Sequence, residues 1–217
     1  MPRTSRARKH LAPQVRSPAD YGTFDGTVCA RWLDDGRFMA LCQPLVFTQR
    51  GGKVWTAPVG TRTDGATIPP IFWSVIGGPF EGQYRTAAVN HDYECCVKHE
   101  AWQDVHRMFF DGMMAKGEAL WRANLMYFAV YFFGPRWLDK TGRPDRGFTE
   151  GDVARAAKYF QYKPATTLPD IETLTRAALR QHSVAIPRSI PGAKLLRDTK
   201  KIQPVDRVGP CIEPGAC

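Results

Sequence analysis

A histidine and an aspartate stand side by side in a segment with helical periodicity, and another aspartate lies in the next such segment. The pair is His91 and Asp92, and the later carboxylate is Asp104. An imidazole can deprotonate water at neutral pH because its ordinary pKa is about 6.5, and a carboxylate behind the ring holds the tautomer that this step requires. We therefore predict a hydrolytic site in which His91 is the base and Asp104 orients its ring.

Two loops upstream of the pair contain the residues that shape tight turns. Asp64 and Gly65 favour a turn, and Pro69 stiffens the loop that follows them. Gly77 and Gly78 form a second glycine loop. Both loops can present backbone carbonyl oxygens to a bound cation, so Gly65, Pro69, Gly77 and Gly78 are expected to shape the site.

A bound cation would stabilise the oxyanion that forms when water attacks an ester or amide. Asp92, beside the base, and Asp64, in the upstream turn, are the carboxylates placed to bind it. Together with backbone carbonyls they form an oxygen ligand set, which suits Ca²⁺. Asp64 can equally cap the short helix that follows or fix its own turn, so its role stays open.

The His-Asp pair needs a rigid helix, and the spacing of small and apolar residues predicts one over 83–98. Asp92 is turned about 100° from His91 on this helix, so the two side chains point in adjacent directions. Asp104 lies beside the apolar stripe of the next helix, either half buried against the first helix or at the rim. Small residues on the stripe of the first helix allow close approach by another element; that stripe is Ala87, Ala88, His91 and Cys95.

The remaining periodic segments predict an α+β fold, in which a small antiparallel sheet packs on a three-helix layer. Further helices are predicted over 100–116 and 118–133, the latter being the most apolar, and a short helix over 71–76. Alternating runs and a glycine turn at 49–52 predict the sheet. Its strands are expected within 27–33, 38–41, 45–48 and 53–56.

Composition divides the chain into four parts: a basic flexible arm over 1–20, the α+β core over 21–138, a helical extension over 139–182 and a basic, proline-containing tail over 183–217. The extension is predicted to contain helices near 150–161 and 170–182. The net charge is +9, and much of the surplus lies at the two ends. Such ends can contact polyanions without sequence specificity, or serve only as solubilising tails.

The sequence shows no secretory signal and no transmembrane segment. The basic N-terminus is not followed by an apolar stretch, and the longest apolar run, near 125–133, is too short to cross a bilayer. We therefore expect a soluble protein of the host cytoplasm or a virion.

The six cysteines form no C-x-x-C pair, so a zinc ribbon is not expected. Reduced, buried thiols are expected for four of them: Cys29, Cys42, Cys95 and Cys96. Cys211 and Cys217 bracket a short loop and can pair in an oxidising compartment. His99 and His106 lie outside the predicted site. They could share one helical face, but a zinc site on them would need two more ligands, which the sequence does not indicate.

A helix with His-Asp, a second helix with Asp and a glycine loop are similar to the phospholipase A2 pattern. This resemblance implies that His91 is the base, Asp92 a calcium ligand and Asp104 the orienting acid, with phospholipid as substrate. Such phospholipases usually have tyrosine three residues after the Asp of the pair, where this chain has Cys95.

A longer stretch, 45–137, resembles an uncharacterised family found in tailed phages and prophages, the domain of unknown function 1353. The family pattern is T-D-G-A-S-I-P, then H-D-Y-L-Y, then A-D-x-x-F. The matching positions begin at Thr63, His91 and Asp104, with Arg85 and Tyr93 expected around the His-Asp pair. Departures from the pattern are Thr67 for Ser, Glu94-Cys95 for Leu-Tyr, and Gln103 for Ala. This resemblance implies a phage association and no particular reaction.

Two hypotheses follow. In the first, the chain is a phage-associated hydrolase of ester or amide bonds, phospholipase-like and metal-dependent, acting on a lipid or cell-envelope substrate. In the second, it is a non-enzymatic accessory or scaffold protein that contacts virion proteins. The first requires His91 in an open cleft, whereas the second allows His91 and Asp92 to be sealed in the core, with Arg85 or the backbone as partner.

Overall fold

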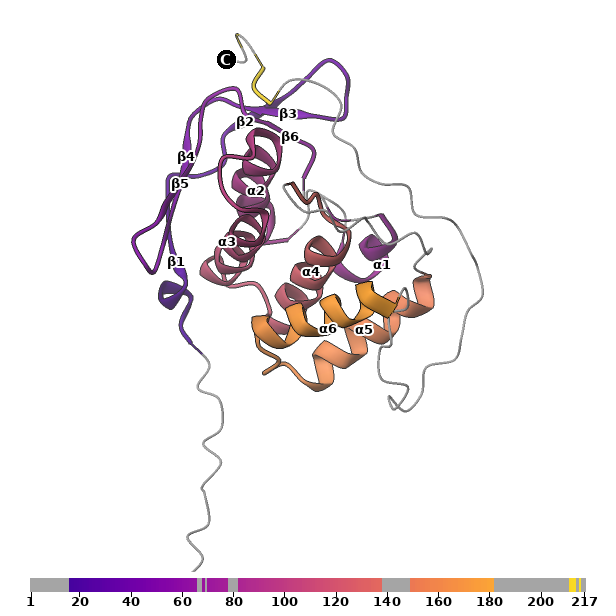
Figure 1. The fold of residues 1–217 in the computed structure, drawn as a ribbon. Helices are drawn as coiled ribbons and strands as arrows, with labels where there is room; N and C mark the ends of the chain where they lie inside the picture. Colours follow the sequence, from indigo (N-terminus) through magenta and orange to yellow (C-terminus); the bar gives the residue numbers. More distant parts are fainter. Residues whose placement is uncertain are drawn as a thin grey trace, which may run out of the picture.

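Two small antiparallel sheets lie against a group of helices in the part of the chain that the structure describes (Figure 1). This computed structural model describes residues 16–65, 68, 70–77, 82–137, 149–181, 211–213 and 215. The first sheet has the strand order β1-β4-β5, with β1 Gly22–Asp25, β4 Leu45–Gln49 and β5 Val54–Ala57. The second has the order β2-β3-β6, with β2 Ala30–Trp32, β3 Met39–Leu41 and β6 Arg62–Thr63.

The helices follow the strands along the chain, apart from a short 3₁₀ turn at Pro18–Asp20. A second 3₁₀ turn, Pro70–Phe72, leads directly into α1. The α-helices are α1 Trp73–Ile76, α2 Arg85–Val97, α3 Trp102–Ala115, α4 Leu120–Phe133, α5 Glu150–Tyr162 and α6 Leu168–Gln181. In the described residues, none of these helices is both long and apolar enough to cross a bilayer.

The predicted α+β class is confirmed, and each predicted helix and strand has a counterpart within a few residues. The strands form two sheets instead of one, because β2 and β3 pair with β6 while β4 and β5 pair with β1. β6 is only two residues long and directly precedes the predicted turn at Asp64 and Gly65, where the sequence predicts no strand. The predicted turn at 49–52 joins β4 to β5 as an antiparallel hairpin.

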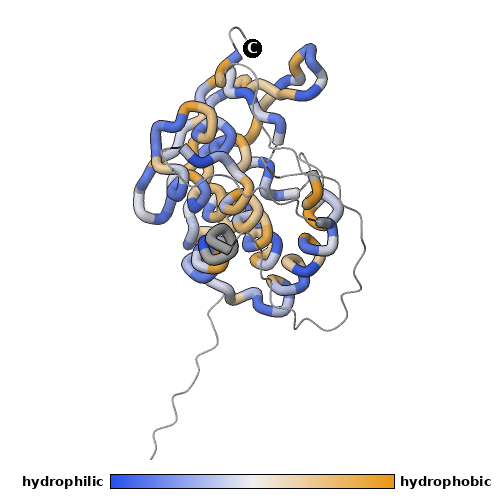
Figure 2. The backbone as a smooth tube through the Cα atoms, turned by 45° about the vertical axis from the view of Figure 1, so that its right-hand side comes forward, coloured by the Kyte–Doolittle hydropathy of each residue, from blue (hydrophilic) through white to orange (hydrophobic). Residues whose placement is uncertain are grey.

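α4 is the centre of the hydrophobic core. It is buried around nearly its whole circumference, since α3, α5 and α6 all pack against it. A helix covered on all sides needs no polar face, which explains why this segment is the most apolar in the chain. Figure 2 shows the hydrophobic segments running through the middle of the molecule.

α2 and α3 approach each other closely at a pair of small residues. An added Cβ at Gly112 of α3 would lie 2.8 Å from the Cβ of Ala87 on α2 and 3.2 Å from the ring of Phe24 on β1. The sequence-based expectation that small residues on the α2 stripe allow close approach is therefore confirmed. This contact determines how near the buried polar residues of the two helices come to each other.

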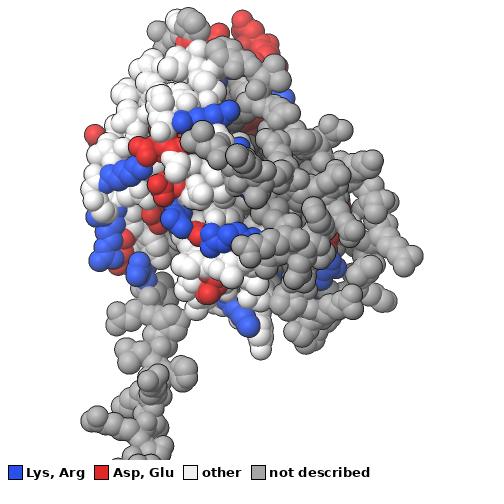
Figure 3. Space-filling model, viewed as in Figure 1, with Lys and Arg blue, Asp and Glu red and all other residues white. Residues whose placement is uncertain are grey.

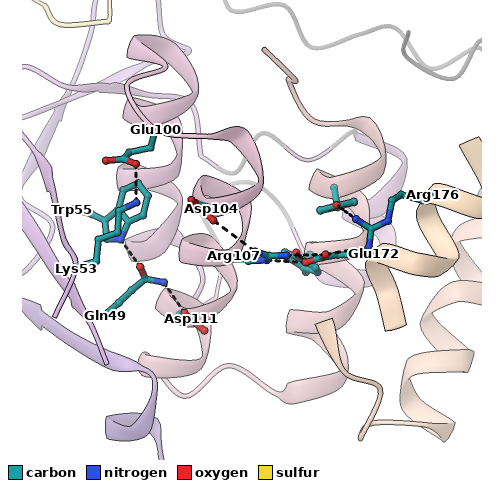
Figure 4. Close-up of polar contacts among 11 residues, drawn as sticks. Gln49, Lys53, Trp55, Glu100, Asp104, Arg107, Asp111, Glu172 and Arg176 are labelled. Atoms are coloured by element: carbon teal, nitrogen blue, oxygen red, sulfur yellow. Dashed lines mark hydrogen bonds and ion pairs between the residues drawn. The ribbon is translucent and has the colours of Figure 1, made fainter. Parts of the chain in front are cut away.

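A chain of polar side chains connects the first sheet to α3 (Figure 4). The indole N–H of Trp55 donates to Gln49 at 2.7 Å, and the amide N–H of Gln49 donates to a carboxylate oxygen of Asp111 at 2.7 Å. Burial raises the pKa of Asp111 to about 6, although the hydrogen bond from Gln49 acts in the opposite direction. Lys53 adds an ion pair to Glu100 at 2.8 Å.

The cysteine predictions need correction. Cys96 of α2 forms a disulfide with Cys211, and Cys42 is also disulfide-bonded, so neither Cys42 nor Cys96 is a thiol. The suggested pairing of Cys211 with Cys217 is wrong for the same reason. Cys29 is an exposed thiol and Cys95 a buried one. The sequence could not show this, because the disulfide depends on a distant segment returning to α2.

The described part of the C-terminal segment is fixed to β6 as well as to α2. Ile212 forms a β-bridge with Thr61, and the backbone N–H of Glu213 donates to the carbonyl of Gly60 at 2.8 Å. Arg62 pairs with Glu213 at 3.7 Å. Residues 211–213 of the predicted extended tail therefore contact the segment 60–62. Residues 182–210 lie outside the described part of the chain.

Replacing Gly112 with valine is expected to lower the free energy of unfolding by about 2–3 kcal/mol, because overpacking a tight core forces neighbours apart. Chemical denaturation followed by circular dichroism measures the change. Gly51→Val is the matched control, because an added Cβ at Gly51 meets nothing within 4 Å. If Gly112→Val were as stable as this control, α2 and α3 would not be packed as described.

Candidate functional site

The two residues of the His-Asp pair are both fully buried, yet they have different neighbours. His91 faces α3, while Asp92 faces Thr63 of β6. This division follows from their positions, since consecutive residues are turned about 100° on a helix. The pair therefore belongs to two separate polar clusters, one on each side of α2.

On the α3 side, His91 contacts a histidine and a cysteine. Its Nε2 lies 2.8 Å from Nδ1 of His106, and the sulfur of Cys95 lies 3.6 Å from the same Nε2. The ring of Phe109 packs against His91 with the two ring centres 4.7 Å apart. All three polar residues are at most 3% exposed. They come from α2 and α3, and their ligand atoms lie within 4.8 Å of one another.

His106 is held as a neutral ring. Burial is the main reason that the pKa of His106 is lowered to about 3, and the positive charge of Arg136 lowers this pKa further. A hydrogen bond with the backbone of Pro135 has the opposite effect and raises the pKa. Nε2 of His106 finds no hydrogen-bond partner of good geometry among the described residues.

On the other side of α2, Thr63 connects β6 to this helix. Its hydroxyl donates to a carboxylate oxygen of Asp92 at 2.5 Å and accepts from the backbone N–H of Gly65 at 3.2 Å. Asp64, between them in the chain, points elsewhere and pairs with Arg37 at 3.2 Å. The segment that contains the predicted turn and the His-Asp helix are thus joined by the hydroxyl of Thr63.

Asp104 lies at the rim of α3, the second of the two positions that the sequence left open. Its side chain is 48% exposed and pairs with Arg107 at 3.7 Å (Figure 4). Arg107 in turn forms two hydrogen bonds with Glu172 of α6, at 2.8 and 2.9 Å. The predicted role of Asp104 as the acid behind His91 has no support in this geometry, since the contact at the buried ring is made by His106.

Sequence reasoning missed His106. A signal was available, because His106 precedes Phe109 by three residues and so shares the apolar face of α3. Asp104 is two residues away from His106, about 200° around the helix, and therefore faces another direction. A sequence pattern could not decide which of the two faces α2 without the rotation of α3.

The other predicted residues are distributed around α2. Gly65 and Gly77 both have positive φ, 91° and 89°, which suits glycine in these loops. Tyr93 packs with a small hydrophobic cluster beneath the strands. Arg85 lines a pocket between the second sheet and α2. Pro69 and Gly78 lie outside the described residues, so their roles in the site remain predictions, as does the Ca²⁺ ion.

A pocket of about 460 Å³ lies between the second sheet and the N-terminal half of α2. Two cationic side chains, Arg85 and Lys116, line it. Thr63 also lines it, so the residue bonded to Asp92 borders this space. The described lining consists of Thr27, Val28, Ala30, Trp32, Met39, Thr63, Gly65, Gln83, Arg85, Thr86, Val89 and Lys116, none of which is acidic.

Part of the chain is similar to proteins that are themselves uncharacterised. Residues 39–130 match the model of a family described as a protein of unknown function (DUF1353). The chain is 45% identical over 123 residues to the uncharacterized protein y4jT of Sinorhizobium fredii, covering 56% of this chain and 37% of that protein. It is 42% identical over 91 residues to the uncharacterized protein y4iH of the same organism, covering 42% of this chain and 38% of that protein.

The chain thus spans less than two-fifths of the length of these two relatives. No solved structure matches it. The matched segment contains Thr63, His91, Asp92 and His106, so both polar clusters lie in the part of the chain that is similar to this family. The phage association and the likeness to phospholipase A2 stay predictions, because the matched proteins are uncharacterised.

Replacing Thr63 with valine is expected to lower the free energy of unfolding by about 1–3 kcal/mol, since it removes a hydrogen bond from a buried carboxylate. Thermal and denaturant unfolding of the purified protein measure this loss. Thr63→Ser keeps the hydroxyl and should recover most of the stability. Equal stability of the valine and serine variants would show that the bond to Asp92 contributes nothing to the fold.

Proposed function

We propose that the domain is a non-enzymatic binding module that takes a small amphipathic anion in the pocket between the second sheet and α2. The main support is the combination of cationic and apolar side chains around one cavity. Ligand pockets in proteins are typically apolar with a few polar groups that set orientation. This version of the accessory-protein hypothesis gives the module a defined ligand class.

The charged end of the ligand would lie near Arg85 and Lys116. Arg85 is the first residue of α2, and Lys116 caps the C-terminus of α3. Neither has an ion-pair partner among the described residues, and no described lining residue is acidic, so a ligand anion would supply the missing countercharge. Arginine and lysine both bind carboxylate and phosphate groups, arginine in a two-bonded fashion.

The apolar part of the ligand would contact the side chains from the second sheet. Val28, Ala30 and Met39 line this part of the pocket, and Trp32 is 53% exposed beside them. An aromatic ring or a short alkyl chain would cover such a surface. A purely ionic ligand would leave these groups in water, so the lining favours a molecule with both characters.

The arrangement favours binding over hydrolysis. His91 is fully buried behind α3 and is absent from the pocket lining. Among the described lining residues there is no histidine, cysteine or carboxylate that could act as a base or nucleophile. The hydroxyl of Thr63 is already bonded to Asp92 and Gly65.

A hydrolase of ester or amide bonds is the second candidate, and one observation favours it. Thr63 borders the pocket, and the carboxylate of Asp92 lies directly behind it at 2.5 Å. Movement of Thr63 would expose a carboxylate to the cavity, where a divalent cation such as Ca²⁺ and a lipid ester could meet it.

We also propose a phage or virion setting for this protein, and contact of its basic ends with polyanions. Most basic residues of the two ends lie outside the described part of the chain. On the described face in Figure 3, basic and acidic side chains are interspersed, without one large patch of either sign.

Titration calorimetry with phenyl phosphate tests the proposed pocket, and phenol is the neutral comparison. We expect phenyl phosphate to bind and phenol to bind at least about tenfold more weakly, a difference of about 1.4 kcal/mol. The double variant Arg85→Ala, Lys116→Ala should lose the preference for the anion. Arg50→Ala is the control, since Arg50 is an exposed arginine outside the lining.

Binding that is equal for the two compounds, or unaffected by the double variant, would contradict the proposed ligand class. Incubation with 4-nitrophenyl butyrate and with phospholipid vesicles, each with and without Ca²⁺, separates the two candidate functions. Turnover that is lost in Asp92→Asn, with the fold retained, would replace the binding module by the hydrolase.

A further inference from the structure

We propose that His91, Cys95 and His106 form a binding site for one thiophilic d¹⁰ metal ion, Zn²⁺ or Cu⁺, which crosslinks α2 to α3. The proposal rests on two imidazole rings and a thiol brought together in the core by two helices. It is independent of the pocket, because the two clusters lie on opposite sides of α2.

The backbone explains how the three side chains meet. His91 and Cys95 are four residues apart on α2, so they project from one face of the helix. His106 comes from the buried face of α3, and the Ala87–Gly112 contact brings the two helices close together. Each side chain is therefore held by a rigid element, which is what a preformed metal site requires.

The distances are near those of a metal site. With zinc–nitrogen bonds of about 2.0–2.1 Å and a zinc–sulfur bond of about 2.3 Å, tetrahedral ligands are separated by about 3.3 Å between nitrogens and about 3.6 Å between nitrogen and sulfur. The sulfur of Cys95 lies 3.6 Å from Nε2 of His91. The nitrogens of His91 and His106 lie 2.8 Å apart and would have to separate by a few tenths of an ångström.

The ligand chemistry selects the ion. Imidazole nitrogen and thiolate sulfur favour Zn²⁺ and Cu⁺, whereas Ca²⁺ prefers oxygen. Nδ1 of His106 is the nitrogen that faces Nε2 of His91, so it is the ligand atom that this ring would offer. Three ligands suit trigonal Cu⁺, while Zn²⁺ would take a fourth ligand such as water.

The surroundings indicate a structural role for the ion. Trp102 and Tyr131 contact the ring of His106, with ring centres 5.5 and 6.4 Å apart, and Phe109 covers His91. These aromatic rings separate the cluster from solvent, so an ion there would not meet a substrate. It would instead add its binding free energy to the stability of the α2–α3 pair.

The competing account is a metal-free core in which His91 and His106 share a hydrogen bond and Cys95 is an ordinary buried thiol. The two accounts differ in the number of metal ions that each protein molecule binds and in the role of Cys95.

Metal binding is tested with the purified full chain, dialysed against Zn²⁺ or, without oxygen, against Cu⁺. Mass spectrometry then measures the metal content of the protein. The variants are Cys95→Ser and, as matched control, Cys29→Ser, since Cys29 is the exposed thiol.

We expect one equivalent of one of the two ions in the wild type and in Cys29→Ser, and loss of that equivalent in Cys95→Ser. The bound ion should also raise the melting temperature of the wild type, because a ligand of the folded state stabilises it. The absence of both ions from the wild type, or equal metal content in Cys95→Ser, would overturn the proposal.

If Cys95→Ser fails to fold, the absorption spectrum of the wild type with Co²⁺ distinguishes the two accounts. A thiolate-to-cobalt absorption band in the near ultraviolet supports Cys95 as a ligand. Bound Co²⁺ without that band, or no bound Co²⁺ and no copper, would leave the hydrogen-bonded core as the correct account.

Discussion

The burial of two adjacent polar side chains on α2 is the constraint on which the rest of the domain depends. A polar group removed from water costs free energy unless another group replaces its hydrogen bonds, and a buried charge costs more. His91 and Asp92 are both fully buried, so each requires a partner from another element. α3 supplies His106 to one, and β6 supplies Thr63 to the other. These two contacts fix α2 against a helix on one side and a sheet on the other.

The same constraint separates two kinds of chemistry. The side toward α3 is closed by aromatic rings and holds nitrogen and sulfur ligands. The side toward the second sheet is open and carries two cations beside apolar residues. An adjacent His and Asp suggest a single catalytic unit when they are read along the chain. In the folded protein His91 belongs to the sealed cluster, and Asp92 supports Thr63 in the wall of the pocket.

Much of the fold could be predicted, because helices and hairpins are local. The apolar period of α3, the small residues of α2 and the glycine turn before β5 each identify an element from its own residues. The choice between Asp104 and His106 could not be made, since it depends on the rotation of α3 about its axis. The disulfide of Cys96 and the pairing of β6 with β3 could not be predicted from the sequence either, because both join segments that are far apart in the chain.

The central claim is that His91 is closed to solvent behind α3. Chemical modification of the native protein by diethyl pyrocarbonate, read residue by residue with mass spectrometry, tests it directly. His99 is exposed just beyond the end of α2 and provides the internal reference. The account predicts that His99 is modified while His91 and His106 are spared until the protein is unfolded. Modification of His91 in the folded protein at a rate close to that of His99 would contradict it.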